Sequence, residues 1–409
     1  MSNIPLSSID QALDRFMRWL EGYGETSWDH QTYFSTVIGG QAKALYYSQP
    51  KLGILAVAPM IFSEAFVPSA RRLFGPRLRF PIADAHYAMG FAFLASARGD
   101  ARLKARAIHF LDELEKERCP DYKHLCWGYP FDWETRGGTI RKNTPLITST
   151  PYVYEAFREV YQLDGNSRWR EAMASIVSHV TEDIKDYPFS KTASTCSYTP
   201  FDEGGTINAS AYRAFMLTSA SLDFSEERYW KIAERNLNLV LETQQENGSW
   251  LYSVKAPGAF VDHFHTCFVL KALAKIDRLR PTEGCWRAIE KGVDYYLSNL
   301  VDESGLPKPF SKAPRMTVYR RELYDYAECI NLCVLLRDKI PALDSLLQRV
   351  LKEILERWIK SDGSFRAREL FLGWDNVPMH RWAQSQMFRA LCLLVLNERT
   401  RTTMGSAHP

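Results

Sequence analysis

The chain has 409 residues, of which 46% are hydrophobic and 24% charged, as is ordinary for a folded soluble protein. Its 51 Lys and Arg residues nearly balance 48 Asp and Glu residues, and this net charge of +3 excludes a broad nucleic-acid-binding surface. The length usually means two or three domains, although a ring of helical hairpins can form one domain of this size.

The first 81 residues are expected to form helices outside the repeating part of the chain. Residues 7–23, SSIDQALDRFMRWLEGY, are amphipathic. An apolar run of 11 residues from Leu52 to Phe62 is too short to span a bilayer. Four arginines follow it: Arg71, Arg72, Arg77 and Arg79. The segment therefore predicts either peripheral contact with an anionic membrane or, more simply, a packed helix with a solvated basic loop.

The start of the chain, MSNIPLSSIDQALDRF, lacks the basic and apolar segments of a secretory signal. The eight cysteines are scattered without a Cys-x-x-Cys pair, which is typical of free thiols in a reducing compartment. We therefore expect a cytoplasmic protein, with a membrane-peripheral position as the alternative.

From residue 82 onward a helical pattern repeats. Polar or turn-rich segments lead into apolar helices at Ile82, Asn143, Gly205, Phe260, Arg321 and Val377, at intervals of 61, 62, 55, 61 and 56 residues. Each of the first five is followed by a helix with one apolar stripe and one charged face, as an outer helix should be. Six such units predict an all-α (α/α)6 toroid over residues 82–398, with residues 7–23 closing the ring and residues 399–409 as a disordered tail.

In such a ring the inner helices all run the same way, so their N-terminal ends gather at one mouth. Polar residues near these ends are therefore candidates for a common pocket. They are Asp84, His86, Asn143, Asn208, Asp262, His265, Tyr324, Asp325, His380, Arg381 and Gln384.

The segment FVDHFHTC, residues 260–267, carries the strongest candidate for acid–base chemistry. Asp262 suits the N-cap of a helix, and His265 would then project from its first turn, where it could act as a general acid or base. A hydrogen-bonded structural histidine is the alternative. A His-x-His metal site is disfavoured because residues i and i+2 of a helix point about 200° apart. We accordingly expect no metal and no cofactor, and add Asp325 and His380 as catalytic candidates.

Turn-rich segments, or joints, connect one helical hairpin to the next. Two of these joints resemble each other: YPFDWETRGG and YTPFDEGG. Their carboxylates, Asp132, Glu134 and Asp202, predict either an acid–base arrangement across a cleft or simple Asp–Gly turns. Tyr198 is a candidate sugar contact in the second joint. Trp250 is another candidate sugar contact, although the surrounding pattern QQENGSW is more typical of the fold than of a binding site.

In the last unit, Arg381 and Gln384 are spaced i, i+3 and should share a helix face. An arginine at a helix N-terminus suits a carboxylate or phosphate ligand. Pairing with a protein carboxylate is the structural alternative.

The segments TPLITSTPYVYEAF, INASAYRAF, GSWLYSVKAPGAFVDHFHTCFVL and MHRWAQSQMFRAL resemble a bacterial family of toroid proteins from polysaccharide and capsule gene clusters, often described as prenyltransferase-like. DHFHTCFVL is similar to the family's Asp-Asn-Phe-His-Thr-Gly-Phe signature, from which His263 and Cys267 depart. The resemblance implies an (α/α)6, six-hairpin glycosidase-like fold and a saccharide context. It carries over only Asp262 and His265.

We therefore expect a carbohydrate-active enzyme of the hydrolase, lyase or uronyl epimerase type, acting in bacterial polysaccharide biosynthesis on a saccharide that is acidic or lipid-linked. A non-catalytic glycan-binding or assembly subunit is one alternative. A prenyl- or terpene-handling enzyme is the other, disfavoured because the chain has neither an Asp-x-Asp-Asp nor an Asp-Asp-x-x-Asp motif.

Overall fold

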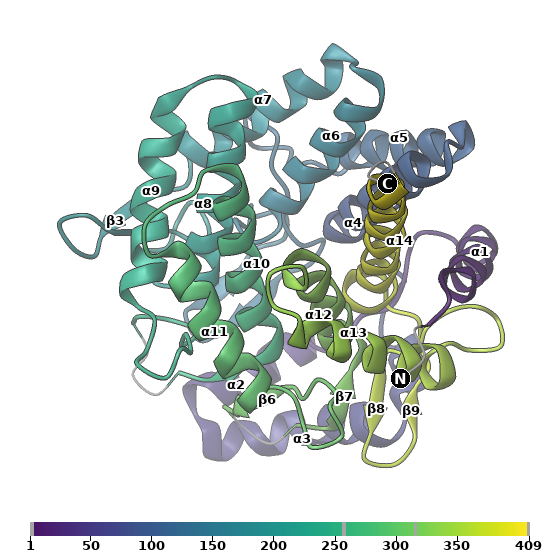
Figure 1. Cartoon of the computed structure of the whole chain (residues 1–409). Coiled ribbons are helices and arrows are strands. Elements are labelled where there is room, and N and C mark those ends of the chain that lie inside the picture. Colours follow the sequence, from purple (N-terminus) through teal and green to yellow (C-terminus); the bar gives the residue numbers. More distant parts are fainter. Residues whose placement is uncertain (1–3, 256–258, 315–316, 407–409) are drawn as a thin grey trace.

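A computed structural model describes residues 4–255, 259–314 and 317–406. The inner ring consists of α4 (Pro81–Arg98), α6 (Thr150–Asp164), α8 (Ile207–Asp223), α10 (His263–Leu279), α12 (Leu323–Leu336) and α14 (Ser385–Ser406). Each inner helix packs against the next, and α14 packs against α4, so the ring is closed (Figure 1). The predicted (α/α)6 toroid is confirmed.

The outer helices are α5 (Ala101–Lys116), α7 (Ser167–Glu182), α9 (Glu227–Glu242), α11 (Cys285–Asn299) and α13 (Ala342–Glu353). Helix α1 (Leu6–Tyr23) packs against α14, in the place of a sixth outer helix (Figure 1). At the other end of the chain α14 continues to Ser406, so residues 399–406 extend the last inner helix where we expected a tail.

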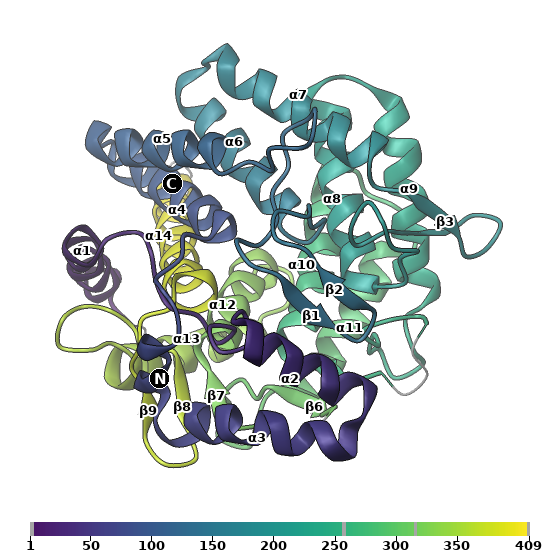
Figure 2. The same cartoon turned by 180° about the vertical axis from the view of Figure 1, so that it is seen from behind.

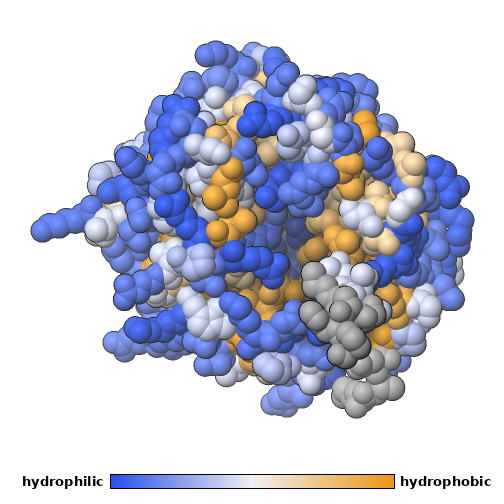
Figure 3. All heavy atoms as spheres, turned by 45° about the horizontal axis from the view of Figure 1, so that its top comes forward, coloured by the Kyte–Doolittle hydropathy of each residue, from blue (hydrophilic) through white to orange (hydrophobic). Residues whose placement is uncertain are grey.

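The two layers differ in burial as their sequences predict. In α4 every residue from Pro81 to Ala95 is buried, whereas α5 buries only the stripe Leu103, Ala107, Phe110, Leu111 and Leu114. An inner helix touches neighbours all around, while an outer helix keeps one face in water. Accordingly, hydrophilic residues cover most of the periphery in Figure 3, and apolar residues gather toward the centre of that view.

Short antiparallel strands lie in the joints between hairpins. They are β1 (Trp133–Thr135) with β2 (Gly138–Ile140), β3 (Asp186–Pro188) with β4 (Ser194–Cys196), β5 (Val261–Asp262) with β6 (Phe310–Lys312), and β7 (Tyr319–Glu322) with β8 (Arg368–Leu370) and β9 (Trp374–Asp375). A π-helix, η3 (His380–Gln384), leads into α14, and another, η2 (Ile354–Trp358), follows α13.

The N-terminal segment adds a hairpin of α2 (Val37–Ser48) and α3 (Pro50–Phe66), followed by the 3-10 helix η1 (Pro68–Leu73). Helix α2 contacts β1, which places the hairpin at the mouth of the ring (Figure 2). Within the described residues, no helix combines the length and the apolar character needed to cross a bilayer.

Three of the four arginines after this hairpin hold protein groups. Arg71 is buried and bonds Glu64 and Asp375, with 2.6 and 2.7 Å between Nη2 and the carboxylate oxygens. Arg77 donates to the backbone carbonyls of Tyr23 and Thr26, and Arg79 pairs with Asp84. The expectation of a solvated basic loop is therefore wrong for these three, because each fastens the N-terminal segment to itself or to the ring.

Candidate functional site

A cavity of about 230 Å³ opens where the N-terminal ends of the inner helices meet. All six hairpins contribute to it, through Ile82, Tyr152, Tyr212, Phe268, Tyr324 and Gln386. Five side chains predicted from sequence line it: Tyr198, Asn208, His265, Tyr324 and Arg381. The ring therefore brings together residues as far apart in the chain as Ile82 and Gln386.

His265 lines the cavity and is hydrogen-bonded to Asp262, which does not line it. The strand β5 ends at Asp262, which is the N-cap of α10 and accepts the backbone N–H of His265 at 3.1 Å. The same carboxylate lies 2.7 Å from His265 Nδ1, and the imidazole is 22% exposed while Asp262 is 2% exposed. Because Asp262 engages Nδ1 as an acceptor, Nδ1 carries the proton and Nε2 is left as a basic nitrogen.

Aromatic rings form most of the remaining wall. Tyr324 and Trp382 are parallel within 5°, with centroids 6.2 Å apart. Tyr252 lies edge-on to the His265 ring, with centroids 4.8 Å apart, and burial raises the pKa of Tyr252 to about 12. Burial likewise raises the pKa of Tyr198 and Tyr324 well above the usual value. These phenols stay protonated at neutral pH, so they can donate hydrogen bonds to a ligand.

Arg381 reaches the cavity, but its charge is already paired. Its Nε and Nη2 donate to the two oxygens of Asp29, at 2.8 and 2.6 Å, and its guanidinium lies 3.8 Å from the ring centroid of Trp382. The structural alternative weighed for Arg381 therefore holds. Its guanidinium packs against Trp382 and presents no unpaired charge to the cavity.

Beneath the aromatic wall lies a buried polar layer. His86 bonds the Gln386 amide, which faces the cavity, and burial lowers the pKa of His86 well below its usual value. Tyr152 and Tyr212 are joined by a hydrogen bond between their hydroxyls. His86 is thus one residue removed from the cavity, where it orients Gln386.

The predicted carboxylates of the joints do not line the cavity. Asp132 pairs with Arg141, and Glu134 accepts from Thr139 on the exposed β1–β2 hairpin. Asp202 closes its own turn by accepting the backbone N–H groups of Tyr198 and Gly204 at 2.9 and 2.8 Å. The turn interpretation therefore describes Asp202, which holds Tyr198 in place, whereas Glu134 lies in strand β1 and bonds across to β2.

Asp325 and His380 are buried away from the cavity. Asp325 lies 3.4 Å from His263 Nδ1, and His263 Nε2 is 2.9 Å from the Tyr296 hydroxyl, so this set belongs to the ring wall. His380 bonds the Tyr87 hydroxyl and the Gly24 carbonyl. Neither side chain is among those that line the cavity.

Three further candidates lie outside the cavity lining in the part of the chain that the structure describes. Asp84 pairs with Arg79, and Trp250 donates from Nε1 to the Val240 carbonyl at 2.8 Å. Asn143 lies in a turn at φ 59°, seven residues before α6 begins at Thr150.

Gln384 was expected to share a helix face with Arg381, but its amide oxygen accepts from the Phe365 N–H and its amide nitrogen donates to the Phe365 carbonyl. The π-helix at His380–Gln384 changes the residue spacing, so positions i and i+3 no longer share a face.

Most of the aromatic wall was not anticipated: Tyr129, Trp133, Tyr252, Phe260, Phe264 and Trp382. Part of this wall could have been recognised in the sequence from the spacing of its residues. Asn208 and Tyr212, Phe264 and Phe268, and Trp382 and Gln386 are i, i+4 pairs at the start of three different inner helices. Such pairs share a helix face, so a search at that spacing would have found them.

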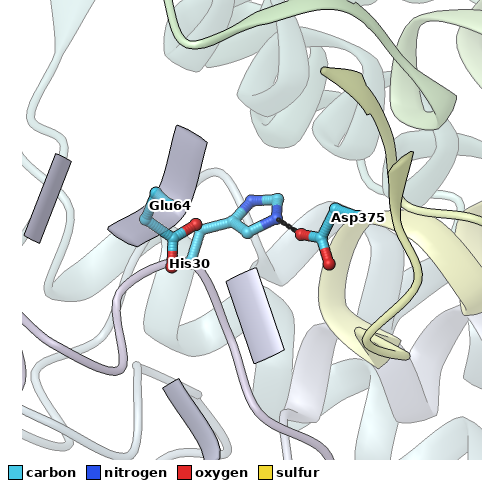
Figure 4. Close-up of side chains that lie close together, drawn as sticks. All are labelled: His30, Glu64 and Asp375. Carbon is cyan, nitrogen blue, oxygen red and sulfur yellow. Dashed lines mark hydrogen bonds and ion pairs between the residues drawn. The ribbon is translucent and has the colours of Figure 1, made fainter. Parts of the chain in front are cut away.

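One group of described residues has donor atoms close enough for a metal ion. His30, Glu64 and Asp375 place one such atom each within 4.8 Å of one another (Figure 4). However, Arg71 bonds both carboxylates, and His30 Nε2 lies 3.2 Å from Asp375. The guanidinium supplies the positive charge that the carboxylates need, so the group fits a buried ion-pair network better than a metal site.

No family model matches the chain, and no curated protein matches it by sequence. Among solved structures it is similar to a cellobiose 2-epimerase from Bacillus thermoamylovorans, with a TM-score of 0.61 and 10% identity over 79% of this chain and 88% of the other. A D-mannose isomerase gives 0.59 and 13% over 79% and 88%. A family 88 glycosyl hydrolase from Bacteroides vulgatus gives 0.56 and 10% over 78% and 91%. At such identities the likeness establishes the toroid fold alone.

Proposed function

We propose that the protein is a carbohydrate-active enzyme that transfers a proton at a sugar carbon, with His265 as the base. The observation that carries this proposal is the Asp262–His265 pair at the wall of the aromatic cavity. Asp262 holds the proton on Nδ1, and Nε2 then takes a proton from the carbon next to the carbonyl of an open-chain sugar. Return of that proton to C1, with the hydroxyl proton of O2 moving to O1, gives a ketose. Return of the proton to C2, after the enediolate has turned its other face toward Nε2, gives an epimer.

The cavity suits one sugar ring. Its volume of about 230 Å³ lies below the roughly 300–1,000 Å³ of sites for drug-sized ligands. Flat aromatic walls such as Tyr324 and Trp382 match the apolar faces of a sugar, and protonated phenols match its hydroxyls. The Oδ1 atom of Asn208 is buried without a hydrogen-bond partner among the described residues, so it can accept a sugar hydroxyl.

Two features favour proton transfer on a neutral sugar over the other reactions considered. No Asp or Glu is among the described residues that line the cavity, whereas glycoside hydrolysis usually needs two carboxylates. Arg381 is neutralised by Asp29, so it offers little to a uronate. The similar structures include proteins described as a cellobiose 2-epimerase and a D-mannose isomerase, and these names denote rearrangement of a sugar without hydrolysis.

We further propose that this reaction takes place in bacterial polysaccharide biosynthesis, in the cytoplasm. The resemblance to polysaccharide-cluster proteins supports a role in bacterial polysaccharide biosynthesis. The eight buried free thiols suit a reducing, cytoplasmic compartment.

Deuterium incorporation tests the reaction. The full chain is incubated in D2O with free aldoses, β-linked disaccharides and uronates, and NMR follows exchange at C2 and the appearance of new sugars. We expect His265→Gln to lower the exchange rate by about 10²- to 10⁴-fold, because the base is lost. Asp262→Asn keeps a good N-cap but no longer fixes the tautomer, and we expect a loss of about 10²-fold or more.

The matched control is the pair His124 and Glu182, another imidazole and carboxylate in contact, at 3.1 Å, but outside the cavity. His124→Gln should leave exchange unchanged. Sugar binding without any deuterium incorporation would instead identify a non-catalytic binding protein, and full activity in His265→Gln would exclude His265 as the base.

A further inference from the structure

The α2–α3 hairpin exposes an unusual amount of apolar surface. Among the described residues, eleven of the sixteen exposed large apolar side chains lie between Val37 and Phe74. The other five are Phe189, Phe201, Leu222, Phe371 and Leu372. Scattered apolar side chains are normal on a protein surface, but a contiguous group of them marks an interaction site.

Helix α3 differs from an ordinary surface helix because most of its large apolar side chains face the solvent. It buries Gly53, Val57 and the charged Glu64 against the protein. Its outer face instead carries Leu52, Ile54, Leu55, Ile61, Phe62 and Phe66, with exposed fractions between 40% and 72%. A helix normally turns its apolar side inward, so this face is built to meet an apolar partner.

The hairpin is firmly attached to the ring, so its exposure is not a sign of loose packing. Glu64 of α3 accepts two hydrogen bonds from Arg71, at 3.0 and 2.6 Å, and Arg71 also reaches Asp375 in β9. The Tyr33 hydroxyl bonds Ser63 at 2.6 Å. The apolar face is therefore held rigidly in position.

The charge around this face indicates what covers it. Between residues 37 and 74 the chain has one acidic residue, Glu64, which is buried and paired. Lys51 and Arg72 are exposed. Glu134 of β1 borders the other helix, α2, near Gly40. An apolar surface with basic and no acidic exposed residues along α3 and η1 matches the headgroups and acyl chains of an anionic membrane.

We propose that the outer face of the α2–α3 hairpin docks the protein on an anionic membrane surface. Helix α3 has 17 residues and lies on the protein, so it enters the interface without spanning the bilayer. The docked hairpin also lies next to the cavity mouth, because α2 contacts β1 (Figure 2). Trp133 of β1 lines the cavity, and Lys43 of α2 bonds Gln31, which lines it too. Docking thus brings the cavity mouth close to the membrane surface.

Flotation with lipid vesicles tests the docking and does not depend on any enzymatic activity, so its failure is distinct from failure of the proposed reaction. We expect the full chain to float with vesicles of phosphatidylglycerol and phosphatidylcholine, and much less with phosphatidylcholine alone. The triple variant Leu55→Ser, Phe62→Ser, Phe66→Ser should lower the partition coefficient by about 100-fold or more. These side chains are 72%, 62% and 50% exposed, so the fold, followed by circular dichroism, should be retained.

The matched control changes one leucine and two phenylalanines elsewhere, Leu222→Ser, Phe189→Ser and Phe201→Ser, and should float like the unmodified chain. Lys51→Glu with Arg72→Glu should weaken binding to the anionic vesicles by about tenfold or more. Equal flotation of the two triple variants would overturn the proposal. So would a dimer in analytical ultracentrifugation that the Leu55, Phe62 and Phe66 substitutions dissociate while vesicle binding is absent, because a second copy would then cover the face.

Discussion

His380 shows how burial decides the role of a residue. It stands at the start of the sixth inner helix, where we expected a catalytic side chain, but its Nε2 lies 3.0 Å from the Gly24 carbonyl and its Nδ1 2.5 Å from the Tyr87 hydroxyl. Nε2 must donate to the carbonyl, so Nδ1 accepts from the phenol and the imidazole is neutral. His265, by contrast, shares its Nδ1 with Asp262 and keeps an edge toward the cavity. The same residue type is structural in one unit and a candidate base in another.

The neutral state of His380 predicts a pH-dependent stability. Burial lowers the pKa of His380 to about 3, so between pH 6.5 and 3 only the unfolded chain protonates this residue, and stability falls as the pH falls through that window. Relative to pH 7, the loss from this residue at pH 5 is about 2 kcal/mol. His380→Gln should reduce the difference in unfolding free energy between pH 7 and pH 5 by that amount, measured by urea denaturation. An unchanged difference would show that His380 is not held neutral.

At the scale of elements, the ring is closed by the contact between α4 and α14. This contact, the α4–α14 seam, requires a glycine at residue 90. A Cβ added at Gly90 of α4 would lie 2.7 Å from the ring of Phe388 in α14. The two helices can approach this closely only because residue 90 has no side chain. Phe388 in turn packs on Phe91 and Phe16, so the seam is a continuous aromatic layer.

Gly90→Ala should therefore destabilise the protein by about 1–3 kcal/mol through overpacking of this seam. The control is Gly22→Ala in α1, where a Cβ would meet nothing within 4 Å. That change should stabilise the protein by up to about 1 kcal/mol, because alanine has the higher helix propensity. Denaturant unfolding measures both variants, and equal effects would argue against close contact at the seam.

At the scale of the whole molecule, the two ends of the chain are joined by α1. Phe16 is fully buried and lies within 5.1 Å of Phe365 and 5.2 Å of Phe388, centroid to centroid. Arg98 and Arg399 reach Asp10 from the first and last inner helices. The ring is therefore closed twice, by the α4–α14 seam and by α1 packed across the outside of α14.

Phe16→Ala should lower the unfolding free energy by about 3–5 kcal/mol, because it leaves a cavity between α1 and α14. Circular dichroism and tryptophan fluorescence should report one shared transition at a lower denaturant concentration, since a closed ring unfolds as a unit. Two separate transitions would show instead that the N-terminal helices unfold independently of the toroid.

Several features could be predicted because they depend on local sequence. The interval of 55 to 62 residues and the alternation of apolar and amphipathic helices predicted the toroid, since each hairpin buries its apolar face only against its neighbours. Asp262 and His265 were predicted together because N-capping involves residues three positions apart. Asn208, Tyr324 and Arg381 follow from the common direction of the inner helices, and Tyr198 follows from the joint that precedes one of them.

Other features depend on contacts between distant segments. Asp29 neutralises Arg381 from 352 positions away, and Asp375 binds Arg71 across 304 positions. The π-helix before α14 separates Arg381 from Gln384. The amino-acid sequence by itself determined the number of hairpins and the capped start of α10, because periodicity and capping act over a few residues. Only the tertiary structure decided which charges are neutralised, which aromatic rings form the cavity and which face of α3 is exposed, because side chains acquire those partners only when the ring closes.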